Sequence, residues 1–180
     1  MKRLTLLCLG FCLLPALAGA QQTKGPDAWE QWRFLIGHWQ AAASGEPGQG
    51  KGVFSFALEL HGKILVRRSL TEFPATSDHA AISHDDLLVV YPESGGAGHR
   101  AIYFDSEGHV IQYHASFDTT GKLLNFSSDP ASGSPSFRLT YSRGENDTLK
   151  VKFEIAAPGK PEVFVTHVEG VAHRTGEAGN

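Results

Sequence analysis

Residues 148–156 read Thr148-Leu149-Lys150-Val151-Lys152-Phe153-Glu154-Ile155-Ala156, so that apolar and charged side chains alternate at every position between Leu149 and Ile155. Successive side chains of a β-strand point to opposite faces of the sheet, and this alternation therefore predicts a strand with one buried and one solvated face. Residues 52–60 show the same pattern, with apolar side chains at Phe54, Phe56, Leu58 and Leu60. Strands of this kind are typical of an antiparallel sheet, in which one face packs on the core and the other meets water.

Similar runs of β-branched and aromatic residues, separated by Gly, Pro, Asp and Asn, recur along the chain and predict about ten strands. They lie at residues 38–43, 52–60, 63–73, 86–91, 100–104, 110–117, 123–128, 136–142, 148–156 and 162–173. Tight turns at His61-Gly62, Ser106-Glu107-Gly108 and Thr119-Thr120-Gly121 indicate β-hairpins. Many strands joined by hairpins close most economically into an up-and-down barrel, because closure removes the exposed sheet edges.

The N-terminal part of the chain carries an export signal and then a short helix. Residues 1–20 begin with Lys2 and Arg3, continue with an apolar run and end in Ala18-Gly19-Ala20, which is the pattern of a cleavable secretory signal. We therefore expect an exported protein, periplasmic or extracellular, with one domain over residues 21–174 and a disordered tail over residues 175–180. Spacings of three and four between apolar residues predict a helix over residues 26–36.

Composition excludes several classes of function. Both cysteines, Cys8 and Cys12, lie in the signal, so the exported chain has no thiol for a disulfide, a zinc ligand or a nucleophile. Sixteen basic against nineteen acidic residues give a net charge of −3, which becomes −5 without Lys2 and Arg3. An acidic chain with no basic stripe indicates no nucleic-acid partner, and no stretch after the signal is long and apolar enough to predict a membrane-spanning helix.

The segment Phe34-Leu35-Ile36-Gly37-His38-Trp39 resembles the Phe-Leu-x-Gly-x-Trp motif of the calycin superfamily, in which a short helix leads into the first strand of a lipocalin-like barrel. The chain is also similar to secreted bacterial proteins of the DUF1579 or lipocalin-like type, which are largely uncharacterised. The resemblance implies that Gly37 and Trp39 close one end of the barrel and that Arg174, near the end of the last strand, packs over the Trp39 ring. Such a cation–π contact contributes roughly 0.5 to 2 kcal/mol.

Barrels of this size often enclose one small molecule, so we expect a partly apolar ligand in the interior, and an inward Arg68 would suit an acid or a carbonyl compound. The candidate polar contacts are Arg68, Gln112, His114 and His167. Arg67 and Arg68 point to opposite faces of one strand, and an inward Arg68 needs an acidic ligand or a counter-ion such as Glu72 or Asp118, because an unpaired buried charge costs several kcal/mol.

Two alternatives to simple ligand binding stay open from the sequence, an enzymatic one and a structural one. The first is a lipocalin-like isomerase or hydrolase in which His114 or His167 acts as general base. The second is a structural envelope protein with a side-chain-filled barrel. The cluster His84-Asp85-Asp86 is interpreted as the solvated start of a strand or a turn.

No cofactor follows from the residues themselves. Nitrobindins, which share the Phe-Leu-x-Gly-x-Trp motif, bind haem through one histidine near the C-terminal end, and His167 lies in the matching region. Their Gly-x-Gly-x-Gly stretch is replaced here by Ala41-Ala42-Ala43-Ser44-Gly45-Glu46, so the resemblance argues against haem. No His, Asp and Glu spacing matches a metal motif, and a site assembled from separate strands, such as one joining His114 with His167, is not visible in the sequence.

Overall fold

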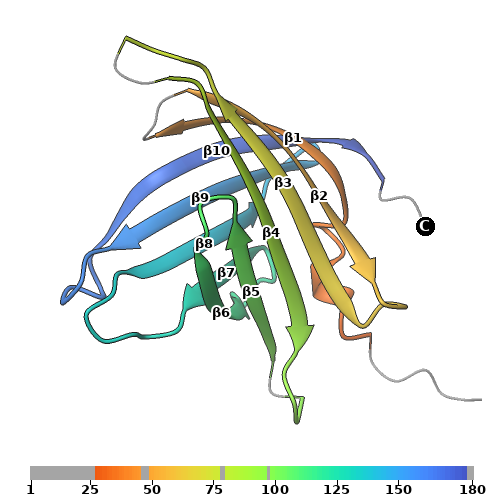
Figure 1. Cartoon of the computed structure of the whole chain (residues 1–180). Coiled ribbons are helices and arrows are strands. Elements are labelled where there is room, and N and C mark those ends of the chain that lie inside the picture. The colour runs from red at the N-terminus through yellow and green to blue at the C-terminus, as the bar shows by residue number, and fades with distance from the viewer. Residues whose placement is uncertain (1–26, 46–48, 78–79, 97, 178–180) are drawn as a thin grey trace, which may run out of the picture.

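A computed structural model describes residues 27–45, 49–77, 80–96 and 98–177 of the chain. Ten antiparallel strands form a closed barrel, in which each strand pairs with its neighbours in the chain and β1 pairs with β10 (Figure 1). The strands are β1 Gly37–Gly45, β2 Gly50–Glu59, β3 Ile64–Phe73, β4 Ile82–Pro92, β5 His99–Asp105, β6 Val110–Phe117, β7 Leu123–Ser128, β8 Ser136–Arg143, β9 Thr148–Ala156 and β10 Phe164–Gly176. The predicted all-β barrel is confirmed.

The ten strands coincide with the ten predicted runs, with differences at some ends. Strand β4 begins at Ile82, so that His84-Asp85-Asp86 lies within a strand, and the interpretation as a turn or a solvated strand start is wrong. Strand β10 continues to Gly176, two residues into the tail for which the sequence predicts disorder. Both extensions are stabilised by ladder pairing with a neighbouring strand, which single-strand composition does not reveal. The predicted signal, residues 1–20, and the last three residues lie outside the described part of the chain.

The predicted helix is present only as the 3₁₀ helix η1, Glu30–Trp32. Its turns are closed by bonds between residues three apart, such as Trp32 N to Trp29 O at 2.9 Å and Leu35 N to Trp32 O at 2.9 Å. A 3₁₀ helix has three residues per turn, so Trp29, Trp32 and Leu35 share one face, and all three are buried. Burial of that single face favours the tighter helix over an α-helix. Among the described residues, no helix has the length and apolarity needed to cross a membrane.

The core lies inside the barrel and is rich in aromatic rings. Phe54 and Phe56 of β2 meet Tyr141 of β8 with ring centroids 6.4 and 5.4 Å apart, and Phe126 of β7 packs against the same tyrosine at 6.3 Å. Phe56, Phe126 and Tyr141 have no exposed surface. Aromatic rings packed edge to face fill the space between opposite walls, so the helix-side half of the barrel is occupied by side chains.

The end of the barrel next to η1, called here the helix end, is closed as the sequence resemblance implied. The Arg174 guanidinium carbon lies 4.3 Å from the centroid of the Trp39 ring, and Arg174 donates hydrogen bonds to the carbonyl oxygens of Phe34 and Ile36. Gly37 has a φ of +131°, and a Cβ there would lie 2.5 Å from Arg174 Nη1 and 2.8 Å from the carbonyl oxygen of Gly176. A side chain at residue 37 is therefore excluded both by the backbone conformation and by the space.

Candidate functional site

The arginine that points into the barrel is Arg67, and the expectation of an inward Arg68 is wrong. Arg68 lies on the outer face, 61% exposed, and its Nη1 is 2.7 Å from the Glu59 carboxylate. Arg67 is 7% exposed and shares the inner face with Leu65. Val66, between them, is also buried, so both faces of β3 are apolar at this point and alternation alone does not identify the inner one.

The other three predicted ligand contacts do not gather in one place. Gln112 and His114 are exposed on β6, where the buried Tyr113 between them marks the inner face. His167 lies on β10 beside a register shift, half-buried, with its ring 6.1 Å from the Phe153 ring in an edge-on arrangement. The structure thus brings none of Arg68, Gln112 and His114 into the interior, and it places the His167 ring against Phe153.

A buried ion pair between the neighbouring strands β3 and β4 faces the interior instead, and one hydrogen bond from it reaches the opposite wall. Arg67 donates hydrogen bonds to the Asp86 carboxylate on β4 and to the Tyr141 hydroxyl on β8, and the side chains of Arg67 and Asp86 are 8% and 6% exposed. Burial would lower the pKa of Arg67, but the nearby Asp86 and the Tyr141 hydroxyl outweigh that effect and raise it. Burial likewise raises the pKa of Tyr141. The guanidinium therefore stays charged and the hydroxyl stays neutral inside the barrel.

Further polar contacts extend from this pair to the barrel end opposite η1, called here the far end. His84 Nε2 lies 2.9 Å from the Tyr103 hydroxyl and 3.8 Å from Asp86 Oδ2, while His84 Nδ1 lies 3.0 Å from Glu107 Oε1. Burial raises the pKa of Tyr103, which holds its hydroxyl neutral. The inner network of Arg67, Asp86, Tyr141, Tyr103 and His84 thus links the core to the turn between β5 and β6.

That turn carries further titratable groups. Asp105 accepts hydrogen bonds from the backbone N–H groups of Glu107 and His109 at 3.1 and 2.8 Å, and His109 Nδ1 lies 2.9 Å from Asp105 Oδ2. Burial opposes ionisation of Asp105, but these bonds outweigh it and hold the pKa of that carboxyl below its usual value. We call His84, Asp105, Glu107 and His109 the turn cluster. In the sequence, the only signal for this cluster is that Asp105, Glu107 and His109 stand at every second position. That His84 lies beside them becomes visible only when β4 and β5 pair.

The outer surface carries a polar groove of about 1040 Å³ across β7, β8, β9, β10 and β1. Its walls are residues that alternate with the core positions of those strands, among them Asn125, Thr140, Lys150, Glu154 and Val171. Figure 1 shows these strands as one continuous curved surface on one side of the barrel. We refer to this hollow as the outer groove.

The charges along the outer groove are unevenly balanced. The Glu154 carboxylate lies 2.7 Å from Arg138 Nε and 3.0 Å from Lys152 Nζ, and it is only 6% exposed. The hydrogen bond from Arg138 is the main cause that lowers the pKa of Glu154, so this carboxyl is ionised and neutralised by its neighbours. Lys51 and Lys150 are exposed in the same groove, and within the described residues neither forms an ion pair. Glu169 also lines the groove, so an anion would find two ammonium groups without an ion pair and one further exposed carboxylate there.

No family model matches this sequence, and no curated protein matches it. One solved structure that matches is described as the de novo design of a fluorescence-activating beta barrel; it is 12% identical, and the match covers 79% of this chain and 95% of that chain with a TM-score of 0.38. A TM-score this low supports no statement on function. The fold assignment rests on the strand pairing itself.

Proposed function

We propose that the protein binds a small, partly apolar anion, and that the ligand lies in the outer groove rather than inside the barrel. The observation that carries this proposal is the pair of exposed lysines, Lys51 and Lys150, on either side of an apolar strip made by Ala42 and Val171. An ammonium group suits a carboxylate or phosphate, and the strip suits a short hydrocarbon or ring.

The strand register supports this arrangement. Lys150 of β9 pairs with Val171 of β10, Val171 pairs with Ala42 of β1, and Ala42 pairs with Lys51 of β2. The two lysines are therefore separated by three strand spacings, or about 14 Å between their backbones. Val171 is 41% exposed between them. A ligand of about ten heavy atoms along this row would meet one or both ammonium groups and cover the valine.

The interior is a poorer place for such a ligand. In the helix-side half the aromatic core fills the barrel, and Arg67 already pairs with Asp86 and Tyr141. An acidic ligand at Arg67 would have to displace a buried carboxylate, which costs several kcal/mol. Binding in the outer groove displaces no buried carboxylate, because Lys51 and Lys150 already face solvent.

Isothermal titration calorimetry with decanoate and 1-decanol tests the proposal on the protein without its signal. We expect decanoate to bind and 1-decanol to bind at least about tenfold more weakly, since it lacks the charge. The variant Lys51→Glu/Lys150→Glu should lose most of the decanoate affinity. The matched control Lys63→Glu/Lys160→Glu makes the same change of net charge at two exposed lysines outside the groove and should bind as the wild type does. Equal loss in both double variants, or no decanoate binding to the wild type, would refute the outer groove as the site.

We further propose that residues 1–20 direct export and that the chain is a lipocalin-like protein of the DUF1579 type. The basic start, the apolar run and the Ala18-Gly19-Ala20 ending support the first part. N-terminal sequencing of protein recovered from a periplasmic extract should begin at Gln21. Haem binding through His167 is an alternative that the missing Gly-x-Gly-x-Gly stretch argues against, and a Soret band in protein from a haem-replete host is its test.

A further inference from the structure

We propose that the turn cluster is a binding site for one divalent transition-metal ion, with His84, Asp105 and Glu107 as its protein ligands. One ligand atom from each of these three residues lies within 4.8 Å of the others. Metal–ligand bonds of about 2.0–2.2 Å in a tetrahedral site separate the ligand atoms by about 3.4 Å, so small side-chain rotations close the set around an ion. This site lies at the far end, outside the outer groove.

The backbone holds the three ligands in place. The β5–β6 turn is fastened to β4 by hydrogen bonds from Ser106 N to Asp85 O at 2.9 Å and from Asp85 N to Ser106 Oγ at 3.2 Å. Gly108 adopts a φ of +90°, which brings the chain back so that Gly108 N bonds to Asp105 O at 3.1 Å. Because β4 neighbours the turn, His84 is presented to the carboxylates without any flexible segment between them.

The second ring nitrogen of His84 is oriented as a metal ligand requires. His84 Nε2 faces the Tyr103 hydroxyl at 2.9 Å and the Asp86 carboxylate at 3.8 Å, and Nδ1 faces Glu107. A histidine that binds a metal through one nitrogen commonly donates from the other to a carboxylate or hydroxyl, which fixes its tautomer and ring plane. With a proton on Nε2, the lone pair of Nδ1 points at the Glu107 carboxylate. Two hydrogen-bond acceptors then face each other, and a cation bound between them removes their repulsion.

Charge also favours a divalent cation. Around His84 lie the carboxylates of Asp86, Asp105 and Glu107, and of these only Asp86 has an arginine partner. Asp105 and Glu107 carry two negative charges that a divalent ion neutralises, with His109 next to both, at 2.9 and 3.8 Å. Glu107 is 49% and His84 25% exposed, so an ion can enter from solvent and keep water in its remaining positions. One imidazole with two carboxylates suits Zn²⁺, Co²⁺ or Mn²⁺.

The experiment is titration of the intact folded domain with Zn²⁺ by calorimetry and with Co²⁺ by visible absorption. We expect one ion per chain and, with Co²⁺, absorption bands of a protein-bound ion. His84→Ala and Glu107→Gln should each weaken Zn²⁺ binding by at least about 100-fold, and Tyr103→Phe, which removes only the partner of Nε2, by about tenfold. Circular dichroism of each variant confirms that the barrel is folded.

The matched controls are His114→Ala and Glu145→Gln, an exposed histidine and an exposed glutamate outside the cluster, and both should bind Zn²⁺ as the wild type does. If His84→Ala binds Zn²⁺ as tightly as the wild type, or if the wild type binds none, the cluster is an ordinary hydrogen-bonded turn in which a proton on His84 bridges to Glu107. Decanoate binding by His84→Ala separates the two proposals, because loss of the metal site leaves Lys51 and Lys150 unchanged.

Discussion

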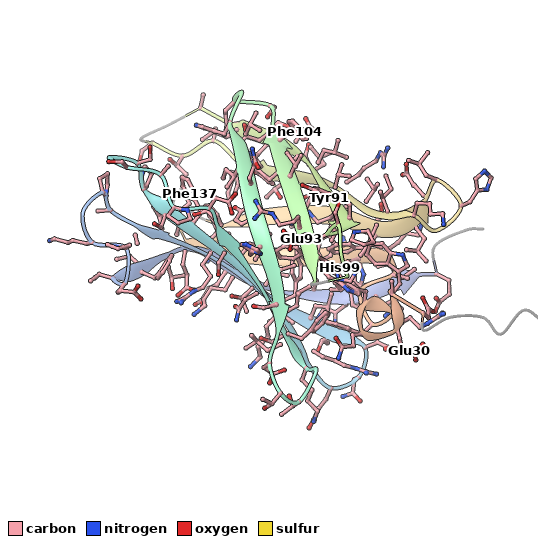
Figure 2. The ribbon with its side chains drawn as sticks, turned by 90° about the horizontal axis from the view of Figure 1, so that it is seen from below. Glu30, Tyr91, Glu93, His99, Phe104 and Phe137 are labelled. Carbon is pink, nitrogen blue, oxygen red and sulfur yellow. The ribbon has the colours of Figure 1, made fainter. Side chains whose placement is uncertain are left out.

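The two ends of the barrel differ in what holds them. At the helix end, Trp29, Trp32 and Trp39 are each at most 4% exposed, and the ring of His99 lies 4.9 Å from those of Trp29 and Trp32. At the far end, the β5–β6 turn is held by hydrogen bonds among Asp105, Glu107 and His109; the side chains of Glu107 and His109 face water, and that of Asp105 is buried beneath them. Figure 2 shows His99 beside the helical turn that carries Glu30, with Phe137 at the other side of the molecule.

This difference indicates a division of tasks. Large apolar side chains at the helix end supply the free energy of folding, because the burial of aromatic surface is the dominant favourable contribution. The far end also holds aromatic rings, such as the stacked pair Phe137 and Phe153, but its β5–β6 turn holds titratable groups close together, where an ion gains from them. Three measurements test this comparison, beginning with the largest expected effect.

Replacing a tryptophan of the helix end should have the largest effect on stability. Trp32 is 1% exposed and its ring lies 5.2 Å from Phe117 and 5.9 Å from Phe126, so Trp32→Ala leaves a cavity that the surrounding rings cannot fill. We expect a loss of about 3–5 kcal/mol in the free energy of unfolding measured in urea. The control Phe104→Ala removes a ring that is 39% exposed and should cost about 1 kcal/mol. Similar losses in both variants would contradict the proposed role of the helix end.

The buried pair between the two ends should have the next largest effect. Arg67→Met leaves the Asp86 carboxylate, 6% exposed, without its cation, and we expect a loss of about 3 kcal/mol in the same assay. Arg67→Met/Asp86→Leu removes both charges and should recover most of that loss, because apolar residues can replace a buried ion pair at little cost. If the double variant is less stable than Arg67→Met alone, the pair does more than neutralise its own charges.

The smallest expected effect is a pH dependence at the helix end. Burial lowers the pKa of His99, and its Nε2 has no hydrogen-bond partner among the described residues. As the pH falls below about 6.5, His99 therefore takes up a proton in the unfolded chain before it does so in the folded protein. The free energy of unfolding is at its full value above pH 6.5 and decreases as the pH is lowered through the depressed pKa of His99. His99→Phe should reduce the drop in urea midpoint between about pH 7.5 and about pH 5.5, and an unchanged drop would show that another group titrates.

Much of the fold could be predicted because each strand carries its own alternation. Residues 148–156 and 110–117 are strands with the predicted bounds, and the contact between Trp39 and Arg174 follows once the first and last strands pair. The candidate site could not be predicted in the same way. The sequence favours an inward Arg68 because that residue shares a face with Ile64, Val66 and Leu70. Leu65 and Val66 are both buried, and only the pairing of Arg67 with Leu88 of β4 shows which face is inner.

The sequence by itself determined the class of fold, because the period of two is a property of each strand and is visible without its neighbours. Tertiary structure alone decided which titratable groups meet: Arg67 reaches Tyr141 across 74 residues, and His84 reaches Glu107 across 23. These contacts depend on the register in which the ten strands pair around the barrel. A shift of one residue in that register would turn each of these side chains to the opposite face of the sheet.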